Sequence, residues 1–157
     1  MNLFEKILIP IDGSQQAHEA LVKGVELAKI LGSKIEIIHI TTFSDEYAPF
    51  IAKGNITTKE STPPQWISEY LENIKQTHQK MIDEAFEYAK KAAPDLNITI
   101  KLLTGRAAEN IIREADKGKF DLIVIGCRGL GGIKGLVLGS VSHSVVNGSK
   151  IPVMIVK

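Results

Sequence analysis

A glycine-rich stretch near the C-terminal end of the chain has the composition of an anion-binding loop. Residues 126–140 read GCRGLGGIKGLVLGS, follow the apolar run DLIVI and lead into VSHSVV, which has helical character. Glycines let backbone N–H groups turn toward an anion with no Cβ in the way. A helix N-terminus adds unpaired N–H groups and a partial positive charge. The stretch is therefore a candidate phosphate-binding loop, with a plain connecting loop as the alternative.

The spacing of this stretch excludes two familiar phosphate-binding motifs. A Walker loop requires Gly-x4-Gly-Lys followed by Ser or Thr, and that pattern occurs nowhere in the chain. A Rossmann fingerprint requires a small residue where Lys134 stands, and it follows the first strand rather than a late one. Any phosphate site here is of another type.

The composition is that of a globular protein. A length of 157 residues predicts one domain, residues 1–157, and 44% hydrophobic with 24% charged residues is ordinary for that class. A net charge of +1 gives no indication of a nucleic-acid or membrane partner. No apolar run is long enough to span a bilayer, and the N-terminus lacks a signal-peptide pattern. Cys127 is the single cysteine, which excludes an intrachain disulfide and favours a reducing, cytoplasmic location.

Strand-like and helix-like segments alternate along the chain. In the first predicted helix Ser14 is a candidate N-cap and Gly32 a candidate stop. The segment from Trp66 to Ala93 reads as one helix or two, preceded by a capping-box pattern at residues 62–65. The predicted strands are residues 6–12, 34–40, 97–103, 121–125 and 151–156, and further helices are expected at 107–117 and after residue 140.

This alternation predicts a doubly wound parallel sheet with helices on both faces. Ligands of such sheets bind outside the carboxyl ends of the strands. Asp12-Gly13-Ser14 follows the first strand, and the glycine-rich stretch follows the fourth. If these two strands are neighbours, both features face one crevice.

The residues now described resemble the universal stress protein family over essentially the whole chain. The most specific element is Gly126-x2-Gly129-x9-Gly139-Ser140, which is similar to the ATP-binding pattern of that family. The opening KILIPIDGS and the ending SKIPVMIV are similar to its first and last strands. The chain resembles the ATP-binding branch rather than the members that lack the glycine pattern.

The resemblance implies a single-domain, three-layer α/β/α fold of the adenine nucleotide α-hydrolase-like type. Its five-stranded parallel sheet would have the order 3-2-1-4-5. ATP would lie between the first and fourth strands, with a role for Mg²⁺ left open. The resemblance also implies a homodimer whose last strands, residues 151–156, meet antiparallel. An edge covered by the 44–64 connection is the alternative.

The resemblance also assigns roles to individual residues. Asp12 would accept hydrogen bonds from the ribose hydroxyls, and Arg128 and Lys134 are candidates for charge compensation. Backbone near Pro10 and around His39–Ile40 would border the adenine, and the start of the last helix would bind the phosphates. The predicted nucleotide-binding residues are Pro10, Ile11, Asp12, Ile40, Gly126, Arg128, Gly129, Gly139, Ser140, Val141 and Ser142.

Several of these residues have a purely structural alternative. Asp12 could cap the first helix, and Ser140 could be the N-cap of the last one. Cys127 is interpreted as a small buried filler rather than a redox sensor. His39 is interpreted as structural rather than as a general base. Trp66, together with Phe50 and Tyr70, could either cover the pocket or pack the connection.

The sequence contains no convincing nucleophile–base pair and no histidine spacing typical of a metal site. ATP held without a dedicated base would be hydrolysed slowly at most. We therefore expect a cytoplasmic, nucleotide-dependent stress-response module. The alternatives are a slow ATPase or nucleotidyl-transfer enzyme, and a protein that binds another adenine nucleotide such as cAMP.

Overall fold

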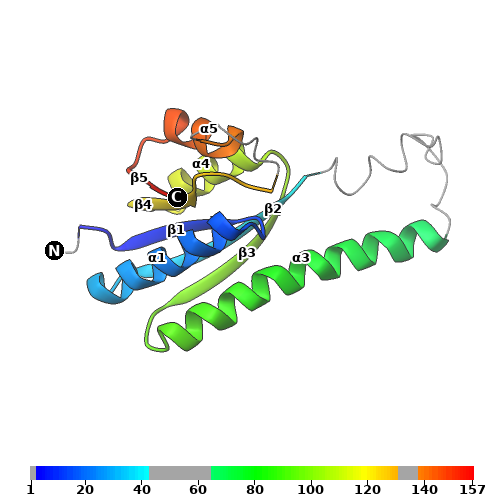
Figure 1. The fold of residues 1–157 in the computed structure, drawn as a ribbon, viewed down its shortest axis with the longest axis horizontal. Coiled ribbons are helices and arrows are strands. Elements are labelled where there is room, and N and C mark those ends of the chain that lie inside the picture. Colours follow the sequence, from blue (N-terminus) through cyan, green and yellow to red (C-terminus); the bar gives the residue numbers. More distant parts are fainter. Residues whose placement is uncertain (1–2, 43–64, 131–137) are drawn as a thin grey trace.

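The described chain folds into three layers, with a parallel sheet between two pairs of helices (Figure 1). The structure is a computed structural model, and it describes residues 3–42, 65–130 and 138–157. Helices α1 and α3 pack on one face of the sheet, and α4 and α5 pack on the other. The predicted three-layer α/β/α architecture is confirmed.

The sheet has the order β3-β2-β1-β4-β5, and every neighbouring pair is parallel. This order confirms the prediction and makes the first and fourth strands neighbours. The last strand begins two residues later than predicted, because Ser149 Oγ accepts from the Ile151 N–H in a local turn. The strands are β1 (Lys6–Ile11), β2 (Lys34–Thr41), β3 (Ile98–Thr104), β4 (Leu122–Gly126) and β5 (Val153–Val156).

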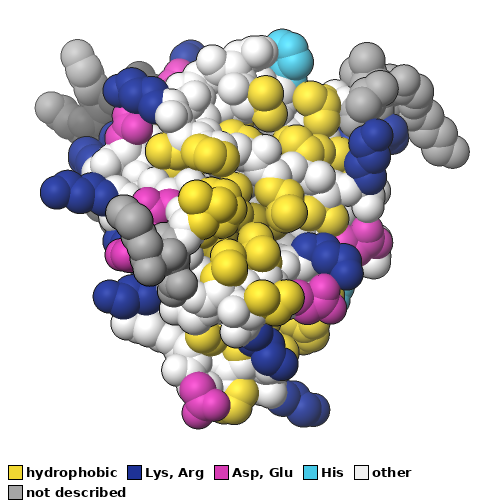
Figure 2. Space-filling model, turned by 90° about the vertical axis from the view of Figure 1, so that its left-hand side faces the viewer, with side chains coloured by type: hydrophobic (Ala, Val, Ile, Leu, Met, Phe, Trp, Pro, Cys, Tyr) yellow, Lys and Arg dark blue, Asp and Glu magenta, His cyan; other side chains and the backbone are white. Residues whose placement is uncertain are grey.

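The two outer strands are β3 and β5, and β5 carries apolar side chains. Met154 of β5 is 40% exposed although it lies in a strand. On the side of the molecule where Figure 1 places β4 and β5, hydrophobic side chains gather in the centre of the face, with charged side chains around them (Figure 2). The described residues give β5 a partner strand on one side only, which is β4.

Local sequence signals explain where the helices begin and end. The side chain of Ser14 caps α1 by accepting from the Ala17 N–H, at 3.1 Å, and Gly32 ends the helix in a left-handed conformation. Residues 65–92 form one continuous helix, while the proposed capping-box residues 62–64 lie outside the described chain. The helices are α1 (Gln15–Leu31), α3 (Gln65–Ala92), α4 (Ala107–Lys117) and α5 (Ser140–Gly148).

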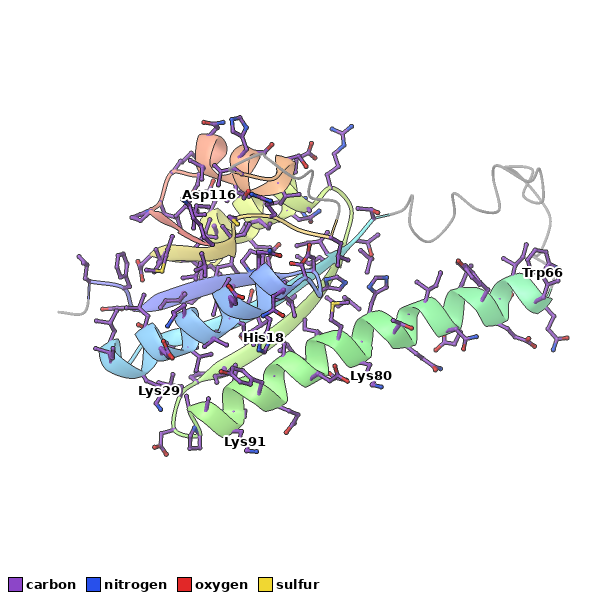
Figure 3. All side chains as sticks on the ribbon, viewed as in Figure 1. His18, Lys29, Trp66, Lys80, Lys91 and Asp116 are labelled. Atoms are coloured by element: carbon purple, nitrogen blue, oxygen red, sulfur yellow. The ribbon has the colours of Figure 1, made fainter. Side chains whose placement is uncertain are left out.

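Helix α3 extends well beyond the sheet, with Trp66 at its far end (Figure 3). Trp66 is 52% exposed and does not line the cavity described below, and neither does Tyr70. The alternative in which Trp66 and Tyr70 cover the pocket is therefore wrong. Phe50 lies outside the described residues. No helix in the described part of the chain combines the length and apolarity that crossing a membrane requires.

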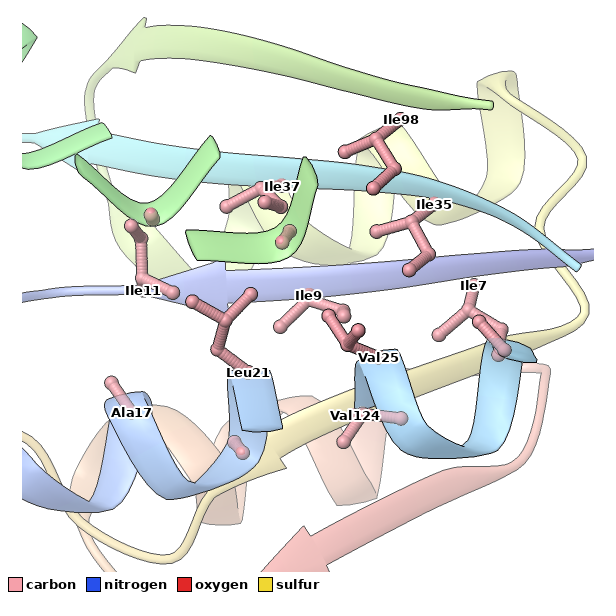
Figure 4. Close-up of a cluster of buried hydrophobic side chains, with 14 of the residues drawn as sticks. Ile7, Ile9, Ile11, Ala17, Leu21, Val25, Ile35, Ile37, Ile98 and Val124 are labelled. Carbon is pink, nitrogen blue, oxygen red and sulfur yellow. The ribbon is translucent and has the colours of Figure 1, made fainter. Parts of the chain in front are cut away.

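A core of branched side chains holds α1 and α3 against the sheet (Figure 4). Ile9 and Ile37 of neighbouring strands are fully buried, and Leu21 and Val25 of α1 pack against them. Burying each such side chain contributes about 1.5–3 kcal/mol. This packing fixes the positions of the strand ends that form the site.

The β1–β4 pair separates toward its carboxyl end. β1 pairs with β4 at Ile7 and Leu8 only, whereas it pairs with β2 as far as Ile11. Pro10, which has no N–H to donate, lies in the separated part. The strand continues past Pro10 to Ile11, because β2 still pairs with it. The separation opens a crevice between the first and fourth strands.

Candidate functional site

A cavity of about 450 Å³ lies where β1, β2 and β4 end. The beginnings of α4 and α5 and one face of α3 complete its wall. The structure brings all eleven predicted nucleotide-binding residues to this wall, and their contact with a ligand remains a prediction. The predicted cation Lys134 lies outside the described residues.

The carboxylate of Asp12 joins the end of β1 to the loop after β4. Its Oδ1 accepts from the Ser14 N–H at 2.9 Å, and its Oδ2 accepts from the Leu130 N–H at 3.1 Å. The N-cap of α1 is Ser14, so the alternative in which Asp12 caps that helix is wrong. A carboxylate has further lone pairs, so Asp12 can still accept from a ligand hydroxyl at the cavity wall.

Two glycines of the motif are required by close packing. A Cβ at Gly126 would come within 2.7 Å of the Gln16 carbonyl, because the first turn of α1 crosses directly over β4. A Cβ at Gly129 would collide with Asp12 Oδ2. These contacts give both positions a structural reason to be glycine, in addition to the approach of a ligand.

The start of α5 is held against the end of β4. Gly139 is the N-cap, and its N–H donates to the Cys127 carbonyl at 2.7 Å. Ser140 is therefore the first helical residue, and the alternative that makes it the N-cap is wrong. The hydroxyl of Ser142 donates to the same carbonyl at 2.7 Å, so its N–H is the donor that remains for a ligand. The N–H groups of the first helical turn have no partners within the helix.

Arg128 gives the cavity an unused donor. Its Nε is buried and has no hydrogen-bond partner among the described residues. A buried guanidinium N–H without a partner is costly, so native structures satisfy it, and a ligand anion would do so. Arg128 is one of four ionisable residues on the described wall, with Asp12, His39 and His78.

Comparison with known proteins decides the family. The model of the universal stress protein family matches residues 3–157. This chain belongs to the universal stress protein family. It is 32% identical to universal stress protein YxiE of Bacillus subtilis, over 99% of this chain and 100% of that one. It is 33% identical to universal stress protein MJ0531 of Methanocaldococcus jannaschii, over 99% of this chain and 84% of that one.

Solved universal stress proteins have the same fold. UspA from Lactobacillus plantarum superposes with a TM-score of 0.74 at 20% identity, covering 97% of each chain. A universal stress protein in complex with cAMP superposes with a TM-score of 0.69 at 23% identity, and the match covers 99% of this chain and 98% of that one. The universal stress protein from Archaeoglobus fulgidus in complex with dAMP superposes with a TM-score of 0.63 at 20% identity, and the match covers 99% of each chain.

Several wall residues of this universal stress protein were not predicted, and two of them come from α3. His78 and Met81 lie one turn apart on the helix and line the cavity beside β1 and β2. Met81 also packs against Gly13, where a Cβ would come within 2.8 Å of its methyl group. The helical spacing of Ile74, His78, Met81 and Ile82 marks the inward face of α3, and that signal could have found them.

Cys127 has a structural environment. It is 6% exposed, and its backbone N–H donates to the Val156 carbonyl at 2.7 Å while its own carbonyl accepts from α5. The burial agrees with the interpretation as a filler. Within residues 3–42, 65–130 and 138–157, no three His, Cys, Asp or Glu side chains are grouped as metal ligands.

Proposed function

We propose that this universal stress protein binds ATP in the cavity at the carboxyl ends of β1, β2 and β4. The observation that carries the proposal is the convergence of three features on one wall. These are the unpartnered Arg128 Nε, the free N–H groups at the start of α5, and the Asp12 carboxylate. Together they offer a cation, an anion-binding helix end and a hydroxyl acceptor.

The three parts of the nucleotide would meet different parts of the wall. The ribose hydroxyls would donate to Asp12, and the phosphates would accept from Arg128 and the N–H groups of Ser140 and Val141. The adenine would lie along the apolar side that Pro10 and Ile40 contribute. Support comes from relatives of the same fold, one of which was solved with cAMP and another with dAMP.

Any Mg²⁺ would be held by the phosphates and by water, because Asp12 is the sole carboxylate on the described wall. The described wall also lacks a base next to a candidate nucleophile, so we propose a binding module rather than an enzyme. The protein would act in the cytoplasm as a nucleotide-dependent regulator of stress responses.

The first test is to denature freshly purified protein and identify the small molecules that it releases by chromatography with mass detection. Near-stoichiometric ATP is the expected result. ADP or AMP would favour the slow ATPase or nucleotidyl-transfer alternative. Bound cAMP, or cAMP that displaces ATP in competition, would favour a cyclic-nucleotide protein. No nucleotide, and no thermal shift with added Mg·ATP, would contradict the proposal.

We also propose that the protein is a homodimer formed through β5. This strand has one described partner strand, it is apolar, and Met154 is exposed on it. Edge strands of this kind pair with other chains. The alternative, coverage by residues 44–64, concerns residues outside the described chain.

A further inference from the structure

Two histidines from different layers contact each other at the wall of the cavity. His39 lies on β2 and is 4% exposed, and His78 lies on α3. His39 Nε2 lies 2.7 Å from His78 Nδ1, and His39 Nδ1 lies 2.8 Å from the Ile11 carbonyl oxygen. The two ring planes differ by 29° and the ring centroids are 4.9 Å apart, so the rings meet edge to edge through these nitrogens. The contacts form a continuous link from α3 through β2 to the end of β1.

The carbonyl fixes the proton positions in this link. A carbonyl oxygen only accepts, so His39 Nδ1 must carry a proton and donate it to Ile11. In a neutral ring the other nitrogen is then an acceptor, so His39 Nε2 accepts from the Nδ1–H of His78. Each hydrogen bond thus orients the ring that makes the next one.

The link ends at the part of β1 that lacks support from β4. Pairing between β1 and β4 stops at Leu8, three residues before Ile11. Ile11 is the last residue of β1, and Asp12 follows it directly. The orientation of the Ile11 carbonyl and that of the Asp12 backbone share one peptide plane. Fixing this carbonyl therefore fixes how Asp12 enters the cavity.

The hydrogen bonds of the link lead to Asp12 through the backbone. The other ionisable groups on the described wall are Asp12 and Arg128. Asp12 accepts from the backbone N–H groups of Ser14 and Leu130. The imidazoles are joined to Asp12 through the Ile11 peptide.

We propose that His39 and His78 are positioning residues for the nucleotide site. His78 orients His39, His39 holds the Ile11 carbonyl, and that carbonyl sets the position of Asp12 toward the ribose. The inference rests on the proposed nucleotide binding and adds α3 to the elements that control it.

The first test uses the nucleotide-free full-length protein and records the nitrogen chemical shifts of the histidine rings by NMR at pH 8. The expected signature is a proton on Nδ1 of both His39 and His78. Spectra of His39→Asn and His78→Leu assign the two rings. The opposite tautomer on either ring would overturn the proposal, whatever the protein binds.

The second test separates the two halves of His39 with two amide variants. The amide nitrogen of asparagine can take the place of Nδ1, so His39→Asn keeps the bond to Ile11 and loses the one to His78. Glutamine reaches the place of Nε2, so His39→Gln keeps the bond to His78 and loses the one to Ile11. We expect the Kd for Mg·ATP to rise within about threefold in His39→Asn and about tenfold in His39→Gln.

If His39 served only to pack α3 on the sheet, His39→Asn would raise the Kd more than His39→Gln, because it loses the bond to His78. That result would overturn the proposal. His78→Leu should match His39→Asn, and adding it to His39→Asn should cost no further affinity, because both changes break the same bond. His18→Asn is the matched control, since His18 contacts Tyr88 rather than the cavity. If the wild-type protein binds no adenine nucleotide, the proposed function fails and the positioning role fails with it. If the wild-type protein binds Mg·ATP but His39→Asn raises the Kd more than His39→Gln does, the positioning role alone is overturned.

Discussion

At the scale of single residues, Arg128 is expected to favour ligand binding and to lower the stability of the nucleotide-free protein. Its buried Nε lacks a partner among the described residues, which is unfavourable in the nucleotide-free protein. Arg128→Met should therefore leave the free energy of unfolding unchanged or raise it. The same change should raise the Kd for Mg·ATP about tenfold or more, because it removes a charge-assisted hydrogen bond. Calorimetric titration and urea unfolding measure the two effects.

The control for this variant is Arg106→Met, since Arg106 pairs with Glu109 on the surface and its side chain is 83% exposed. Adenosine, which has no phosphate, should bind wild type and Arg128→Met equally. A variant that loses adenosine affinity and stability as well would show that Arg128 supports the fold instead of the phosphates.

A second prediction at this scale concerns an ion pair away from the cavity. Lys101 Nζ on β3 lies 2.5 Å from Glu114 Oε2 on α4, and Glu114 is mostly buried. The hydrogen bond to Glu114 is the main reason that the pKa of Lys101 is raised above its ordinary 10.5. A raised lysine pKa stabilises the fold below pH 10.5, and this stabilisation is lost as the pH rises past the folded-state pKa.

Lys101→Met should therefore be less stable than wild type at pH 8, and the difference should shrink at pH 11. Lys101 is 45% exposed, so solvent screening keeps the effect small. Urea unfolding at the two pH values measures it, with the exposed Lys29→Met as the control. A difference that stays constant with pH would assign the effect to packing of the lysine stem.

At the scale of secondary-structure elements, the glycines of the motif divide into two functions. A Cβ at Gly126 would come within 2.7–2.9 Å of backbone atoms of Gln16 and Ala17, so α1 would have to move away from β4. Gly126→Ala should cost about 1–3 kcal/mol of stability, as overpacking does. Gly139→Ala brings a Cβ to 3.3 Å from the Arg128 Cα, with an ordinary φ of −76°.

Gly139→Ala should therefore cost less stability than Gly126→Ala, because the Arg128 backbone needs to move by only a few tenths of an ångström. It should bind Mg·ATP more weakly, because that movement displaces the start of α5 and the Arg128 backbone, which both line the cavity. Thermal unfolding and nucleotide titration of both variants test this division. Equal loss of stability in the two variants would contradict it.

The elements themselves were largely predictable from local signals. Ser14 and Gly32 mark the ends of α1, and alternation of apolar segments located the five strands. The strand order came from the resemblance, because periodicity alone does not say which strands are neighbours. The wall contributed by His78 and Met81 was missed, because only the packing of α3 on the sheet brings those side chains to the ends of β1 and β2.

Two details of the site depended on tertiary contacts that no local pattern reports. Serine is a common N-cap residue, so the sequence favours Ser140 for that place. In the structure Gly139 is the N-cap, and its N–H donates to the Cys127 carbonyl. The sequence predicts a ligand contact for Gly126, and the crossing of α1 over β4 gives it a packing role as well. Both cases follow from the approach of segments more than ten residues apart.

At the scale of the whole molecule, the apolar edge strand determines the predicted assembly. β5 has β4 on one side and no described strand on the other, and Met154 is 40% exposed. A lysine at this position would place a charge in the middle of an antiparallel β5–β5 interface, facing its symmetry mate or a close neighbour. Met154→Lys should therefore convert a dimer into a monomer at micromolar concentration, as measured by light scattering after gel filtration.

Lys157→Glu is the companion variant, since it changes a charge beyond the end of β5 and should leave the dimer intact. The cavity is lined by described residues of one chain, and Met154 is not among them. Met154→Lys should thus bind Mg·ATP as tightly as wild type while remaining a monomer. A wild-type protein that is monomeric at micromolar concentration would contradict the dimer, and a monomeric variant that loses nucleotide affinity would show that the partner chain supports the site.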